Sequence, residues 1–257
     1  MSDNRIILTP MFLDQAMSGL EALAQPGWVL NKPAMPAGDA QTRMGVVHQA
    51  LAVFVAAALK AGQRAVSIAG DCCTAIGVAA GLQRAGLDFK LIWFDAHGDF
   101  NTPETTPSGF LGGMPLAMLA GRGDLTMPSA VGLSPLPENR IILTDGRDLD
   151  PEEAAMLKRS QVVHLPDPED LSGHLLGEDP LWVHFDVDVV ARAESPAQNY
   201  PAEGGPSAAA LNVVFAVLAG TGRLAAVSMS AWNPELDRDG RSAQISMALL
   251  ATLVGEI

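Results

Sequence analysis

Short apolar runs alternate along the chain with longer segments in which apolar residues recur at helical spacing. Apolar runs predict buried strands at residues 64–69 (RAVSIA), 90–94 (KLIWF), 139–144, 161–165, 181–187 and 224–229. Helical spacing predicts helices at residues 42–61, 74–85, 151–160, 207–219 and 241–255. Strands that are apolar throughout and separated by helices are typical of a parallel sheet covered on both faces. The pattern therefore predicts an α/β fold.

The composition is that of one globular domain spanning residues 1–257. Hydrophobic residues make up 48% of the chain and charged residues 18%, which is too apolar for a disordered protein. A chain of this length can bury a large core. Because no segment resembles an interdomain linker, we expect a single domain.

Charge and cysteine content narrow the classes of partner. A net charge of −13 argues against nucleic acid or an anionic membrane surface as the main partner. The two cysteines, Cys72 and Cys73, are adjacent, so they cannot build a disulfide framework and indicate a reducing compartment. The first residues lack the charged segment followed by an apolar segment that is typical of a signal peptide, and no apolar run is long enough to span a bilayer. We expect a cytoplasmic protein.

Acidic side chains gather directly after two of the predicted strands. Asp95, His97 and Asp99 lie at i, i+2 and i+4, so an extended backbone projects all three from the same side. Asp186 and Asp188 repeat this spacing at the end of strand 181–187. The carboxyl ends of strands in an open α/β sheet form its binding crevice, so we expect the two clusters to share one site.

This arrangement predicts a metal site. Four buried carboxylates would carry about four negative charges, and burying unpaired charge is very costly. Two divalent cations would balance that charge, and carboxylates with one imidazole suit Mn²⁺, Fe²⁺ or a similar ion. Two such cations roughly 3.5–4 Å apart can activate a water molecule as a nucleophile. The alternative is that the aspartates cap turns or face solvent; two clusters with His97 among them argue against it.

At these residues the sequence resembles the arginase/agmatinase/formiminoglutamase (ureohydrolase) family. The hallmarks of that family are a Gly-Gly-Asp-His-Ser turn, an Asp-Ala-His-x-Asp segment and a Ser-Phe-Asp-x-Asp segment. The matching stretches here are AGDCCT at 69–74, WFDAHGDFNTPETTPSG at 93–109 and HFDVD at 184–188. The resemblance covers most of the chain. It implies a three-layer α/β/α sandwich with a mostly parallel sheet (an arginase-like fold) and a binuclear manganese centre.

The resemblance also implies roles for individual residues. Asp95 and Asp186 match the two aspartates that bridge the metals, and His97 and Asp188 match the other ligands of one metal. Asp99 matches a ligand of the second metal. One complete half-site and part of the other are therefore expected.

Cys72 occupies the position of the histidine ligand expected in the second half-site. A thiolate can bind a metal, and it would shift the preference of the site from Mn²⁺ towards Zn²⁺, Fe²⁺ or Ni²⁺. The alternative is that Cys72 is a small buried hydrophobic residue and that the second ion is absent or weakly bound. The sequence leaves both alternatives open.

Two further departures from the family concern the substrate. Gly112 replaces the family histidine that transfers a proton, and Ala231 replaces the family glutamate that binds a guanidinium group. Since glycine and alanine can do neither, free arginine is a doubtful substrate. Asn101 and Ser108, in the loop after strand 90–94, and Trp232, next to Ala231, are candidate substrate-binding residues.

Two hypotheses about function follow. The first is a metal-dependent hydrolase that cleaves a non-peptide C–N bond in a small amidine, guanidino or amide substrate with metal-activated water. The second is a catalytically degenerate metal-binding protein of the same fold (a pseudoenzyme). The loss of both family residues supports this second hypothesis, whereas the retention of five family metal ligands argues against it. The resemblance also implies a homo-oligomer, a trimer or a hexamer.

Overall fold

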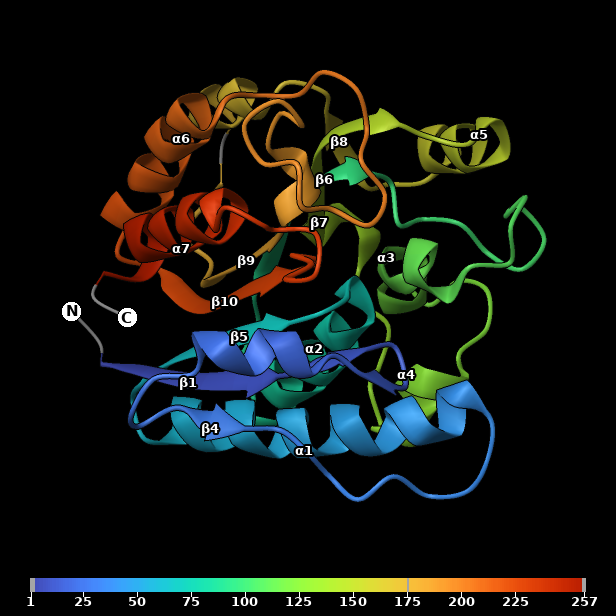
Figure 1. The fold of residues 1–257 in the computed structure, drawn as a ribbon. Helices are drawn as coiled ribbons and strands as arrows, with labels where there is room; N and C mark the ends of the chain where they lie inside the picture. The colour runs from blue at the N-terminus through green and yellow to red at the C-terminus, as the bar shows by residue number, and fades with distance from the viewer. Residues whose placement is uncertain (1–2, 175, 256–257) are drawn as a thin grey trace.

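The computed structural model describes residues 3–174 and 176–255, and a parallel sheet of eight strands runs through its centre (Figure 1). Each neighbouring pair of strands is parallel. In spatial order the strands are β4 (Val29–Leu30), β1 (Asn4–Thr9), β5 (Arg64–Ala69), β10 (Leu224–Ser230), β9 (Leu181–Asp186), β6 (Lys90–His97), β7 (Ile141–Asp148) and β8 (Val163–Leu165). A separate antiparallel hairpin joins β2 (Met11–Phe12) to β3 (Gln15–Ala16).

Helices cover both faces of the sheet. One face packs against α1 (Ala40–Lys60), α2 (Ala75–Arg84), α3 (Pro115–Leu119), α4 (Thr126–Ala130) and α5 (Pro151–Arg159). The other face packs against α6 (Ala208–Gly220) and α7 (Arg241–Val254), which lie side by side in Figure 1. Short 3-10 turns complete the chain: η1 (Ser18–Leu23), η2 (Cys72–Thr74), η3 (Leu111–Gly113), η4 (Glu138–Arg140), η5 (Pro168–Gly173) and η6 (Val187–Val189). The expected three-layer α/β/α sandwich is confirmed.

The core lies on both sides of the sheet because strand side chains alternate between its faces. In β6, Leu91 and Trp93 belong to the apolar cluster under α1 and α2, whereas Ile92 and Phe94 belong to the cluster under α6 and α7. The Phe94 ring meets the ring of Phe215 from α6 edge-on, with the centroids 4.9 Å apart. This burial on two faces is why the strands are apolar throughout.

The predicted elements are present, with different boundaries at some ends. β6 continues to His97 and β7 to Asp148, beyond the predicted ends at 94 and 144. These ends are polar and line the binding edge of the sheet, so hydrophobicity does not mark them. The strand β1, the edge strand β4 and the short helices α3 and α4 were not predicted from the sequence.

Helix α1 corrects one expectation. It is 21 residues long and its 18-residue window reaches a mean hydropathy of 1.4, enough by length and composition to cross a membrane. More than half of that window, 56%, is buried inside the protein. The helix packs against α2, α4 and β5, so its apolar composition is explained by its place in the core.

The sheet order brings four strand ends together. β5, β10, β9 and β6 are consecutive neighbours although they are far apart in the sequence. Because all four are parallel, their carboxyl ends meet at one edge of the sheet. The acidic segments that follow β6 and β9 therefore reach the same place as the Cys72 turn after β5.

Candidate metal centre

The six predicted metal ligands converge at this edge, but local turns position two of them. The extended backbone expected through Asp99 ends at His97, and Asp99 itself has a left-handed backbone with φ of 49°. Asp188 lies in the η6 turn, where its N–H donates to Asp186 Oδ1 at 2.8 Å. Both acids still face the site, although simple strand alternation does not place them there.

The first half-site consists of Asp95, His97 and Asp188, each of which offers a ligand atom within 4.8 Å of the others. His97 Nδ1 lies 3.0 Å from Asp188 Oδ2 and 3.4 Å from Asp95 Oδ1. Backbone groups fix both carboxylates, since His97 N–H donates to Asp95 at 2.7 Å and Ala96 N–H donates to Asp188 at 3.1 Å. An imidazole between two carboxylates is a donor set for a divalent cation.

The second half-site consists of Cys72, Asp95 and Asp99, whose ligand atoms also lie within 4.8 Å of one another. Cys72 Sγ lies 3.0 Å from Asp186 Oδ2 and 4.0 Å from Asp95 Oδ2. The thiol therefore faces the acids as well as being buried. Asp99 Oδ2 is buried and has no hydrogen-bond partner among the described residues. An orphaned carboxylate oxygen of this kind is what a bound cation would satisfy.

Burial and mutual repulsion hold protons on these groups when no cation is present. Burial, reinforced by neighbouring aspartates, raises the pKa of Asp95 and raises the pKa values of Asp99 and Asp186 well above their ordinary range. Burial also raises the pKa of the Cys72 thiol, with Asp186 adding to the effect. At His97 burial works against the charge, but hydrogen bonds to Asp188 and Asp95 outweigh it and raise the pKa to about 12. Opposite charge is therefore needed to ionise the acids together.

Buried polar side chains lie next to the Cys72 thiol. His184 Nε2 lies 3.4 Å from Cys72 Sγ, and Ser230 Oγ lies 3.0 Å from it. The His184 ring stacks on Trp93 with the centroids 3.7 Å apart, and burial lowers its pKa to about 3, so the imidazole is neutral. His184 is therefore a buried, neutral neighbour of Cys72.

The cavity over the cluster has a volume of about 450 Å³, within the usual range for a small-molecule site. Asn101 and Ser108 line it, and their binding of a substrate stays a prediction. Trp232 is not among the described residues that line it: its ring is buried in the apolar core, and its N–H donates to Asp237 at 2.9 Å. A substrate-binding role for Trp232 stays a prediction that this orientation does not favour.

Other residues of the cavity were missed by the sequence analysis. Asp148, Asp150 and Glu153 line it from the end of β7 and the start of α5. Their place after a strand was a usable signal, as it was for Asp95 and Asp186. Phe12 carried no such signal, because β2, which holds it, was not predicted, whereas Tyr200 lies in the long loop that follows the predicted strand β9.

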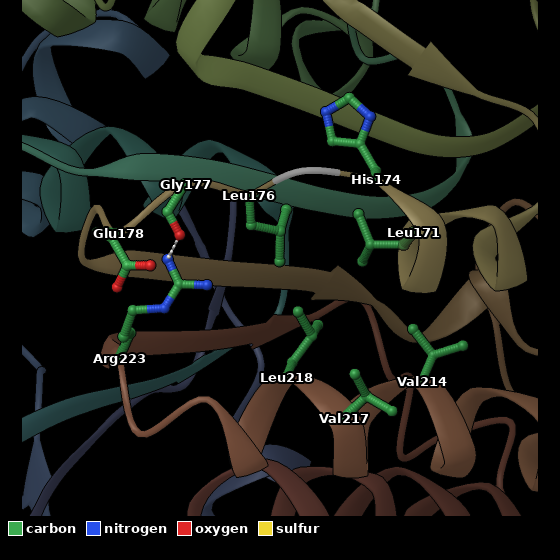
Figure 2. Close-up of a pocket in the computed structure, with 9 residues that line it drawn as sticks. All are labelled: Leu171, His174, Leu176, Gly177, Glu178, Val214, Val217, Leu218 and Arg223. Atoms are coloured by element: carbon green, nitrogen blue, oxygen red, sulfur yellow. Dashed lines mark hydrogen bonds between the residues drawn. The ribbon is translucent and has the colours of Figure 1, made fainter.

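A second cavity, of about 390 Å³, lies between α6 and the segment after η5. Figure 2 shows an apolar lining from both sides and the Arg223 guanidinium donating to the Gly177 carbonyl at 2.7 Å. None of the predicted site residues lines it. Of these two cavities, the one over the predicted metal ligands is therefore the candidate functional site.

Comparison with known proteins agrees with the fold. The sequence model of the Arginase family matches residues 10–255. The chain is 28% identical over 236 residues to arginase from Bacillus caldovelox, covering 85% of this chain and 79% of that protein. The solved structure of that arginase superposes with a TM-score of 0.81 at 24% identity, covering 100% of this chain and 99% of the other. Formimidoylglutamase from Bacillus subtilis superposes with a TM-score of 0.75 at 13% identity, covering 99% of this chain and 86% of the other.

Proposed function

The chain belongs to the arginase family, and we propose that it is a metal-dependent hydrolase that cleaves a non-peptide C–N bond in a small amidine, guanidino or amide substrate other than free arginine. The observation that carries this proposal is the convergence of Cys72, His97 and four buried aspartates at the carboxyl ends of adjacent strands. Burying so many acids without structural need is costly, so a functional role accounts for them best.

The donor set fits one or two divalent cations. Asp95, His97 and Asp188 would hold one, and Cys72, Asp95 and Asp99 the other, with Asp186 beside Cys72. Family resemblance favours Mn²⁺, whereas the thiol favours Zn²⁺, Fe²⁺ or Ni²⁺. Such ions supply the positive charge that activates a water molecule and polarises the bond to be cleaved.

The remaining residues of the cavity restrict the substrate. Ala231 lines the cavity and offers no carboxylate to a guanidinium group, and Gly112 cannot carry a proton. A proton for the leaving amine must come from elsewhere. Burial raises the pKa of Glu153 to about 7 and that of Asp71 to about 6, and both line the cavity, so either could carry a proton near neutral pH.

Metal analysis followed by a substrate screen tests the proposal. Elemental analysis of protein purified without added metal should find one or two equivalents of a transition metal. The screen would offer guanidino, formimino and acetylated amines in the presence of Mn²⁺, Zn²⁺, Fe²⁺ or Ni²⁺. A C72H variant should raise manganese occupancy, because it restores the family imidazole at a thiol that faces the cluster.

The loss of both family residues also favours the second candidate, a metal-binding pseudoenzyme. This candidate predicts bound metal but no turnover of any substrate class with any of the four ions. Turnover that disappears on chelation and returns on addition of metal would exclude it.

Cellular location and assembly are part of the same proposal. Both cysteines are buried and unpaired, which is compatible with a reducing cytoplasm. A homo-oligomer, a trimer or a hexamer, is proposed from family resemblance and can be measured by sedimentation.

A further inference from the structure

Three aromatic side chains gather on the wall of the metal cavity. The Phe110 ring lies 4.8 Å from that of Tyr200 and 6.2 Å from that of Phe12, measured between centroids. All three residues line the cavity that also contains Cys72 and His97. We call Phe12, Phe110 and Tyr200 the aromatic wall.

Hydrogen bonds made by neighbouring residues anchor the outer two members of the wall. Leu13 N–H, adjacent to Phe12, donates to the Asp71 carboxylate at 2.7 Å, directly beside the Cys72 turn. On the other side, Asn199 Oδ1, adjacent to Tyr200, accepts from Asn233 Nδ2 at 2.6 Å. The wall therefore has a fixed position relative to the metal ligands, although its residues come from distant parts of the sequence.

Phe110 takes the space that a side chain at position 112 would need. A Cβ atom placed on Gly112 would lie only 2.5 Å from Cζ of Phe110 and closer still to Cε1. The family residue that is absent at position 112 is thus replaced by an apolar ring surface, and the cavity is not simply enlarged there.

The lining of the cavity combines two kinds of chemistry. Besides the aromatic wall it includes carboxylates of the cluster, together with those of Asp148 and Asp150. None of the described residues that line the cavity is Lys or Arg. Tyr200 is 51% exposed and Phe110 is half-buried, so both rings present surface to a ligand. A complementary ligand has a polar or cationic end and a flat apolar end.

We propose that the aromatic wall binds an aromatic group of the substrate, so that the substrate is an amide or amidine of an arylalkyl amine. This inference rests on the proposed function for the reacting end of the substrate, but the ring contact is a binding property that can be measured separately. The aromatic group stacks on Phe110 and Tyr200, while the C–N bond faces the metal ligands.

Binding of product-like amines tests the wall directly. Benzylamine and n-propylamine share an ammonium group and differ in the ring, and calorimetry on the metal-loaded protein measures the affinity of each. We expect benzylamine to bind at least about tenfold more tightly, in line with the energy of an aromatic pair and its buried area. Equal affinity of the two amines would overturn the proposal.

Variants identify the residues responsible. Y200A should reduce the preference for benzylamine to within about threefold, F110A should do the same, and Y200F should retain it because the ring is kept. L236A is the matched control: Leu236 is also 51% exposed but does not line the cavity. A preference that survives both Y200A and F110A would contradict the proposal.

The two proposals fail in different ways. An affinity that depends on the ring, without hydrolysis of N-benzylformamide, N-benzylformamidine or other benzylamine derivatives, would support ring binding by the aromatic wall. The same result would contradict the proposed hydrolase activity. Hydrolysis with equal kcat/KM for benzyl and propyl derivatives, together with equal affinity for the two amines, would uphold the hydrolase and reject the wall.

Discussion

Cys72 Sγ lies 3.0 Å from Asp186 Oδ2, although the strands at whose ends these two residues lie are separated by a third strand in the sheet. Cys72 lies after β5, Asp186 ends β9, and β10 runs between them. A thiol at this position can bind a metal together with Asp95 and Asp99. It is also the point at which this chain departs most clearly from the ligand set that family resemblance implies.

Replacing Cys72 with alanine should abolish thiolate coordination. With Co²⁺ bound, the wild-type protein should show a sulfur-to-cobalt charge-transfer band in the near ultraviolet, and C72A should lack it. Cys73 provides a matched control because it is also buried but directs Sγ to the Leu111 carbonyl at 3.5 Å. The band should persist in C73A. A band of undiminished strength in C72A would show that the thiol is not a ligand.

The metal-free protein should become less stable as the pH rises. The pKa values of Asp95, Asp99 and Asp186 are raised above their ordinary value of 3.8, so the folded state holds protons that the unfolded state has lost. The stability that these groups contribute is present at low pH and is lost as the pH rises through their folded pKa values. Thermal unfolding in chelator should therefore show a lower Tm at pH 8 than at pH 5.

D99N, measured in the same way, should stabilise the metal-free protein at pH 8 by at least about 1 kcal/mol, because asparagine is neutral and does not have to take up a proton when the protein folds. D88N is the control, since Asp88 is 76% exposed and should change stability by less than about 0.5 kcal/mol. Added metal should stabilise the wild type more than D99N. An unchanged Tm between pH 5 and pH 8 would contradict the electrostatic account of the cluster.

Arg147 should support one half-site without being a ligand. Its guanidinium donates to the carbonyls of Asp188 at 2.8 Å and Val189 at 3.3 Å, and it pairs with Asp145. Lysine cannot donate this set of hydrogen bonds from one planar group, so R147K should lower stability by about 1–3 kcal/mol and weaken Mn²⁺ binding.

The matched change for Arg147 is R192K, because Arg192 makes an exposed ion pair with Glu203. R192K should leave stability within about 0.5 kcal/mol of the wild type. Urea unfolding and metal titration would measure both effects. Equal metal affinity in R147K and R192K would show that the turn holding Asp188 does not depend on the guanidinium.

Two neighbouring glycines should differ in their tolerance of a methyl group. G112A forces the new Cβ against the Phe110 ring, whereas a Cβ on Gly113 meets nothing within 4 Å. We expect G112A to cost about 1–3 kcal/mol and G113A to lie within about 0.5 kcal/mol of the wild type. Urea unfolding measures both. Similar losses of stability in the two variants would show that the Phe110 ring does not occupy the space next to Gly112.

Much of the fold follows from the sequence because its signals are local. Unbroken apolar runs such as residues 90–94 predict strands buried on both faces, and Asp150 with Pro151 predicts the start of α5, where the structure shows a capping box. The polar strand ends did not follow in the same way. Asp99 turns into the site through a left-handed backbone rather than by strand alternation, which hydrophobic spacing cannot reveal.

The sequence by itself determined most strands of the sheet, the longer helices and the positions of the acids at the ends of β6 and β9, because these depend on neighbouring residues. Only the tertiary structure decided which of these acids meet Cys72, that Trp232 turns into the core, and that Phe110 fills the space beside Gly112. Phe12 and Tyr200 reach one wall from near the N-terminus and from the loop after β9. These relationships depend on the order of strands in the sheet, which is set by packing between segments that lie far apart in the chain.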